Sequence, residues 1–152
     1  MTKQVDSPHS NDDVRLAMRS PVVTLEPCAT LRAAAAVLSW HDIGAVAVVG
    51  SSEELIGMLS ERDLVRSLGD GADPDRTRVS GAMNGSPRFV DTGSPLWAAT
   101  MLMLQLGVRH LPVTEDRRVV GMLSIRDALA VMERDRLIEP RSSMETVDGP
   151  LD

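Results

Sequence analysis

A seven-residue segment occurs twice in this sequence of 152 residues. Residues 57–63 read GMLSERD and residues 121–127 read GMLSIRD, which is an offset of 64 residues. The same offset, taken without a gap, also pairs apolar positions further upstream: Ile56 with Val120, Val49 with Val113, and Ala34 with Ala98. Self-similarity at a fixed period indicates a duplicated structural unit. We therefore expect the chain to fold as two related halves.

Each copy of the segment passes from an apolar stretch directly into a Ser-x-x-Asp sequence. Ser60 and Ser124 are placed to cap a helix, because a serine oxygen accepts hydrogen bonds from the amides of the first helical turn. Asp63 and Asp127 then lie in that first turn, where the helix dipole favours a negative charge. The repeat predicts two equivalent polar helix starts that face a shared groove. Helix capping alone is the simpler interpretation of both motifs.

Apolar periodicity and turn residues predict the same order of elements in both halves, namely strand, helix, strand, strand and helix. This order indicates an α/β (α+β) fold. The predicted elements of the first half are a strand at 22–25, a helix at 30–40, strands at 45–49 and 55–59, and a helix at 60–68. Those of the second half are a strand at 88–90, a helix at 95–106 capped by Ser94, strands at 108–113 and 119–123, and a helix at 124–136.

The remaining segments divide the chain into domains. We expect a disordered lead-in at 1–11, a first domain at 12–68, a linker at 69–76, a second domain at 77–136 and a mobile tail at 137–152. The linker is rich in Gly, Asp and Pro, which favour turns and loops. A short helical spacing of apolar residues opens each domain, at Val14 and Met18 and again at Val79 and Met83.

Composition excludes several classes of protein. The net charge of −6 lacks the basic footprint of a nucleic-acid or membrane-surface binder. The single cysteine, Cys28, cannot form a disulfide within the chain, and we see neither an N-terminal signal stretch nor an apolar run of membrane-spanning length, so we expect a cytoplasmic protein. The histidines His9, His41 and His110 are far apart in the sequence, and no nucleophile–base set or metal-ligand spacing is evident. We therefore predict that the protein is not an enzyme and requires no cofactor.

Together these motifs resemble a known family. Both halves resemble cystathionine-β-synthase (CBS) domains, and the chain resembles a stand-alone tandem pair, often called a Bateman module. The resemblance rests on the apolar run 43–49, the two Gly-Met-Leu-Ser-x-x-Asp motifs, Asp73-Pro74 in the linker, and Leu111-Pro112-Val113. It implies a pseudo-twofold pair of domains that commonly forms a flat, disc-shaped homodimer, with parallel and antiparallel assembly both open. It also implies adenosine-containing ligands, namely AMP, ADP, ATP or S-adenosylmethionine, in clefts between the two domains.

The resemblance assigns roles to particular residues. Asp63 and Asp127 would accept hydrogen bonds from ribose hydroxyls, and Ser60 and Ser124 would hold phosphate oxygens together with the helix amides. The residues implied to border the adenine are Val23, Thr24, Val46, Ala47, Phe89, Val90, His110 and Leu111. The implied phosphate partners are Arg62, Arg109, His110 and Arg126.

The two predicted clefts are chemically unequal. At the 64-residue offset, Arg109 and His110 fall on Ala45 and Val46, and Pro112 falls on Val48. We therefore expect unequal affinities, with one or two sites occupied. The predicted function is a non-catalytic regulatory module that binds an adenosine-containing ligand and signals to an unidentified protein partner. The alternative is a structural or interaction dimer that binds no nucleotide.

Overall fold

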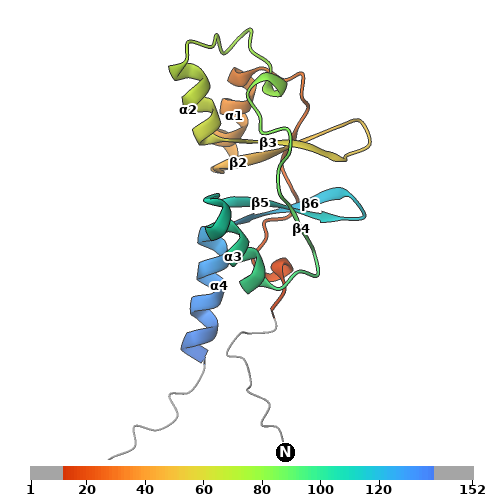
Figure 1. Ribbon diagram of the computed structural model, residues 1–152, viewed down its shortest axis with the longest axis vertical. Helices are drawn as coiled ribbons and strands as arrows, with labels where there is room; N and C mark the ends of the chain where they lie inside the picture. Colours follow the sequence, from red (N-terminus) through yellow and green to blue (C-terminus); the bar gives the residue numbers. More distant parts are fainter. Residues whose placement is uncertain (1–11, 139–152) are drawn as a thin grey trace, which may run out of the picture.

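The computed structural model describes residues 12–138 and confirms two related halves, each with a three-stranded sheet covered by two helices (Figure 1). The elements of the first half are the 3-10 turn η1 (Val14–Leu16), β1 (Thr24–Leu25), α1 (Leu31–His41), β2 (Ala45–Val49), β3 (Leu55–Ser60) and α2 (Glu61–Gly69). Those of the second half are the turn η2 (Val79–Gly81), β4 (Val90–Asp91), α3 (Leu96–Leu106), β5 (His110–Glu115), β6 (Arg118–Ser124) and α4 (Ile125–Ile138). The sequence-based lead-in at 1–11 and most of the tail lie outside the described residues.

Each sheet has the same topology. In the first half β1 runs parallel to β2, and β2 pairs with β3 as an antiparallel hairpin. In the second half β4, β5 and β6 repeat this arrangement. The two sheets lie next to one another in the middle of the molecule, with α1 and α2 beyond one sheet and α3 and α4 beyond the other (Figure 1).

The central strand β2 is buried along its whole length, which explains its continuous run of apolar residues. Val46 and Val48 belong to the core between this sheet and its helices. Ala47 and Val49 point the other way and pack with Val119 of the second half. Because successive residues of a strand face opposite sides, one strand contributes to the core of its own half and to the contact between halves.

Strand register shows that the repeat contains a one-residue gap. Gly57 and Gly121, 64 residues apart, pair with Val48 and Val113, which are 65 residues apart. The 65-residue offset also relates the helices upstream, since α1 begins at Leu31 and α3 at Leu96. The gapless alignment was therefore wrong for the residues before β3.

The gap lies in the first hairpin, and it changes which residues are equivalent. Val49 pairs with Leu55 in the first half, whereas Thr114 pairs with Val119 in the second, so the first connection is one residue longer. Ala45 and His110 are therefore equivalent, because they pair with the two serines that end β3 and β6. The corrected counterparts of Arg109, His110 and Pro112 are Gly44, Ala45 and Ala47.

The opening turn of each half packs on the core of the other half. Val14 in η1 is fully buried in the cluster that contains Leu96 and Met103 of α3. Val79 in η2 is fully buried in the cluster that contains Leu31 of α1. The domain boundaries 12–68 and 77–136 stay a prediction, and the packing adds that neither segment completes its own core.

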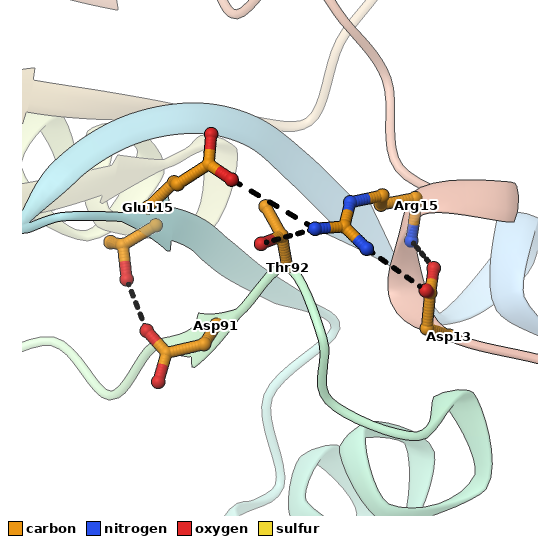
Figure 2. Close-up of polar contacts among 6 residues, drawn as sticks. Asp13, Arg15, Asp91, Thr92 and Glu115 are labelled. Atoms are coloured by element: carbon orange, nitrogen blue, oxygen red, sulfur yellow. Dashed lines mark hydrogen bonds and ion pairs between the residues drawn. The ribbon is translucent and has the colours of Figure 1, made fainter.

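Polar contacts also hold the N-terminal segment on the second half. Figure 2 shows the Arg15 guanidinium between three side chains, where it donates to Asp13 Oδ2 at 3.1 Å and to Thr92 Oγ1 at 3.1 Å. Glu115 Oε1 lies 3.8 Å from the same guanidinium. These contacts are largely exposed and contribute little energy. They lie on the N-terminal segment that continues to Arg19, which lines one of the clefts.

The helix termini follow the predicted caps with two differences. Thr30 and Ser60 cap α1 and α2 as expected. Pro95, not Ser94, is the N-cap of α3, and it makes no side-chain hydrogen bond. The last helix extends to Ile138, two residues beyond its predicted end. Within residues 12–138, the helices are too short or too polar to cross a lipid bilayer.

Candidate ligand-binding clefts

Two clefts lie between the halves, and each contains one Ser-x-x-Asp motif. The Asp127 cleft has a volume of about 370 Å³, and its polar lining residues are Arg19, His41, Asp42, Arg109, His110, Ser124, Arg126 and Asp127. The Asp63 cleft has a volume of about 250 Å³, and its polar lining residues are Ser60, Glu61, Arg62, Asp63, Arg66, Asn84, Arg109 and His110. Gly44, Arg109 and His110 line both clefts and form a shared wall.

The structure brings most of the sequence-predicted site residues to these clefts. Val23, Arg109, His110, Ser124, Arg126 and Asp127 line the Asp127 cleft. Ser60, Arg62, Asp63, Arg109 and His110 line the Asp63 cleft. The helix-start serines and aspartates thus lie beside the predicted arginines, as a site for a sugar phosphate requires.

The other predicted residues, chosen as the border of the adenine, do not line either cleft. Val46, Ala47 and Leu111 are buried in hydrophobic clusters, and Val90 packs against the core of the second half. Thr24 and Phe89 are exposed outside the clefts. Their assignment as ligand contacts stays a prediction.

Asp63 is engaged in a complete capping box at the start of α2. Its Oδ2 accepts hydrogen bonds from the Ser60 amide at 2.8 Å and from the Ser60 hydroxyl at 2.8 Å. The Asp63 amide in turn donates to Ser60 Oγ at 3.2 Å. One carboxylate oxygen thus serves the helix, while Oδ1 lies 4.0 Å from the Arg66 guanidinium.

Asp127 has a different partner. Ser124 Oγ accepts a hydrogen bond from the Asp127 amide at 3.0 Å, so half of the capping arrangement is kept. The Asp127 carboxylate, however, accepts through Oδ2 from Arg19 Nε at 3.0 Å. Arg19 comes from the N-terminal segment that crosses to the second half. The acid of this cleft is therefore paired with a cation instead of with its own helix.

The shared wall joins the two halves at His110 and Gly44. A Cβ atom placed on Gly44 would lie 2.9 Å from His110 Cε1, so the glycine allows the ring to approach the backbone closely. Burial lowers the pKa of His110, the nearby Glu61 carboxylate opposes this shift, and Arg109 adds to it. The net effect disfavours the protonated, charged form of the imidazole.

The most informative residues that sequence reasoning missed are Arg19, Asn84, Glu61 and Gly44. Arg19 and Asn84 follow the methionines of the opening turns, Met18 and Met83, so the repeat itself carried a signal for them. Their place in the clefts follows from the crossing of those turns, which local periodicity does not reveal. Among the described residues, no group of His, Cys, Asp and Glu side chains is arranged to hold a metal ion.

Comparison with known proteins identifies the family. The family model described as CBS domain matches residues 12–70 and again residues 79–134. The chain therefore belongs to the CBS domain family and contains two copies of the domain. This confirms the resemblance noted from the motifs.

Relatives and solved structures support this assignment to the CBS domain family. The chain is 34% identical over 99 residues to hypoxic response protein 1 of Mycobacterium tuberculosis, covering 64% of this chain and 69% of that protein. The CBS domain protein PAE2072 of Pyrobaculum aerophilum, solved in complex with AMP, superposes with a TM-score of 0.73 at 26% identity and covers 81% of this chain and 99% of that one. The CBS domain pair of protein MJ0100, solved with 5′-methylthioadenosine and S-adenosyl-L-methionine, shares the fold with a TM-score of 0.74 at 20% identity, covering 80% and 99% of the two chains.

Proposed function

We propose that this protein is a non-catalytic regulatory module that binds an adenosine-containing ligand between its two CBS domains and passes the bound state to a protein partner. The observation that carries the proposal is the Asp127 cleft, where a carboxylate, a helix N-terminus and three arginines line one cavity of about 370 Å³. Such a set supplies acceptors for ribose hydroxyls and donors for phosphate oxygens.

The comparisons support the same class of ligand. PAE2072 was solved with AMP, and the MJ0100 pair was solved with two adenosine derivatives. For this chain the candidate ligands are AMP, ADP, ATP and S-adenosylmethionine. A ligand that prefers one arrangement of the two halves shifts their equilibrium, which is how binding could reach a partner.

Isothermal titration calorimetry tests the proposal. AMP, ADP, ATP and S-adenosylmethionine are titrated into protein that has been unfolded and refolded to remove carried-over ligand. We expect saturable binding of at least one ligand, weakened by Asp127→Ala or Asp63→Ala. Absence of binding for all four ligands in the folded wild-type protein would overturn the proposal and leave the structural dimer as the better explanation.

We also propose a homodimer, because apolar side chains lie exposed on the helices. Val65 and Leu129 occupy equivalent places in α2 and α4 and are 69% and 52% exposed. Trp40 near the end of α1 is 86% exposed. A second copy of the chain would remove this surface from water, at about 25 cal/mol per Å² of apolar area. We place this dimer in the cytoplasm, where the free thiol of the exposed Cys28 would stay reduced.

Light scattering coupled to size-exclusion chromatography tests the dimer. We expect the wild-type protein to elute with twice the mass of 16.4 kDa, and the Val65→Glu/Leu129→Glu variant to elute as a monomer. Arg134→Glu, an exposed change on α4, serves as the charge control. A wild-type monomer at micromolar concentration would contradict this assembly.

A further inference from the structure

The two clefts are built on equivalent backbones. Arg19 and Met122 exchange both backbone hydrogen bonds, at 2.9 and 3.2 Å, beside the Asp127 cleft. Asn84 and Met58 exchange the same pair of bonds, at 2.9 and 3.0 Å, beside the Asp63 cleft. Arg19 and Asn84 therefore occupy equivalent places, so the chain has a cation in one cleft where it has a neutral amide in the other.

A second difference in charge occurs at the first residue of the helix after each motif serine. Glu61 begins α2 and its amide donates to the Gly44 carbonyl at 2.9 Å. Ile125 begins α4 and its amide donates to the Arg109 carbonyl at 2.8 Å. Glu61 and Ile125 line the Asp63 and Asp127 clefts respectively. At these two places the Asp127 cleft is the more positive, although each cleft is lined by three arginines and two acids, with Arg66 in the Asp63 cleft and Asp42 in the Asp127 cleft.

The guanidinium of Arg19 is oriented so that it can bind an anion. Its Nε donates to Asp127 Oδ2 at 3.0 Å, which fixes the plane of the group. Within the described part of the chain, its Nη atoms have no hydrogen-bond partner. Their planar fork matches a phosphate, and Asp127 Oδ1 stays available for a ribose hydroxyl. A nucleotide can thus use both side chains without breaking the ion pair.

The Asp63 cleft has a negative charge at the place that Ile125 occupies in the other cleft. The Glu61 carboxylate lies in the first turn of α2, close to where a phosphate would meet the helix amides, and like charges repel there. Asn84 provides an amide but no charge on the facing side. An adenosine ligand that lacks a phosphate avoids this repulsion, and a cationic one gains attraction.

We propose that Arg19 and Ile125 make the Asp127 cleft prefer phosphate-bearing adenosine ligands more strongly than the Asp63 cleft does, because Asn84 and Glu61 occupy the equivalent places there. This proposal rests on the adenosine-ligand function above and adds the class of ligand that the Asp127 cleft prefers. Arg19 acts as a specificity-determining residue, and Asp127 positions it.

Isothermal titration calorimetry tests this preference with variants that carry the residue of the other cleft. AMP and adenosine are titrated into the wild type, Arg19→Asn, Ile125→Glu and the control Arg117→Asn. Arg19→Asn should weaken AMP binding roughly tenfold or more, because charge-assisted hydrogen bonds to phosphate are lost, while the adenosine affinity changes by less than about twofold. Ile125→Glu should act in the same direction, and Glu61→Ile should strengthen AMP binding to the Asp63 cleft.

The control and the outcomes separate this inference from the proposed function. Arg117 is exposed in the turn between β5 and β6 at a φ of 67°, a conformation that asparagine tolerates, so Arg117→Asn removes the same charge away from both clefts. Equal AMP affinity in the wild type and Arg19→Asn would overturn this preference while the ligand-binding function stands. A wild type that binds none of AMP, ADP, ATP, adenosine and S-adenosylmethionine would overturn both.

Discussion

The imidazole of His110 lies directly against the backbone of Gly44, with room for hydrogen atoms but not for a methyl group. A Cβ atom on Gly44 would lie 2.9 Å from His110 Cε1 and 3.2 Å from Nε2. This contact joins the start of β2 in one half to the start of β5 in the other, in the wall that both clefts share. Together with Arg109, this glycine and this ring separate the two clefts.

The first prediction concerns this contact. Gly44→Ala should lower the free energy of unfolding by about 1–2 kcal/mol, because the added methyl group displaces the His110 ring. In a His110→Ala background the same change should cost less, since residues in contact are not additive. Urea denaturation of the four proteins measures the coupling, and Gly69→Ala, with open space around its Cα, is the control. Equal costs in both backgrounds would contradict the contact.

The second prediction is a pH dependence of stability. Because burial lowers the pKa of His110, the unfolded chain binds a proton more readily than the folded one as the pH falls below about 6.5. The folded protein should therefore lose stability between about pH 6.5 and the lower folded pKa, and His110→Gln should flatten this slope. Thermal melting from pH 7.5 to 5.5 measures it. A wild-type slope in His110→Gln would contradict the prediction.

The third prediction separates the two motif aspartates by stability. Asp63→Ala removes the two hydrogen bonds that the carboxylate accepts from Ser60 but keeps the amide bond to Ser60 Oγ, so we expect a loss of about 1–2 kcal/mol. Asp127→Ala removes a largely exposed ion pair with Arg19, so we expect a loss below about 1 kcal/mol. Chemical denaturation at pH 7 measures both. A larger loss for Asp127→Ala than for Asp63→Ala would contradict this prediction, because the ion pair with Arg19 would then stabilise the fold more than the capping box does.

The fourth prediction concerns the glycine at the start of the repeated segment. A Cβ on Gly57 would overlap the Met83 side chain and would lie 3.1 Å from the Asn84 carbonyl oxygen, so Gly57→Ala should destabilise the protein by about 1–3 kcal/mol. Met83→Ala should restore only part of this loss, because the backbone contact remains. Urea denaturation of the single and double variants checks it. Full additivity of the two losses would refute the overlap.

Much of the fold was predictable because its signals are local. The duplicated motif, the strand patterns and the caps at Thr30 and Ser60 each depend on residues a few positions apart, and the structure confirms them. The gap in the repeat was not predictable in this way. Val46, Ala47 and Val48 are all apolar, so sliding the alignment by one residue still pairs apolar residues, and only the strand register separates the two alignments.

The site was predicted only in part, because some of its residues reach the clefts through packing between distant segments of the chain. Asp127 and Arg126 follow from the motif itself, but Arg19 reaches the same cleft from 108 positions earlier. Its arrival depends on the crossing of the N-terminal segment onto the second half. The buried positions of Val46 and Leu111 likewise depend on which face of each strand meets the helices. Both are properties of the assembled halves, which a single sequence does not display.

The exchange of opening turns has a consequence for the two halves taken apart. Val14 fills the interior built around α3, and Val79 fills the interior built around α1. A cut within 69–76 leaves each fragment without the turn that completes its interior. Mixing the two fragments should therefore restore structure to both.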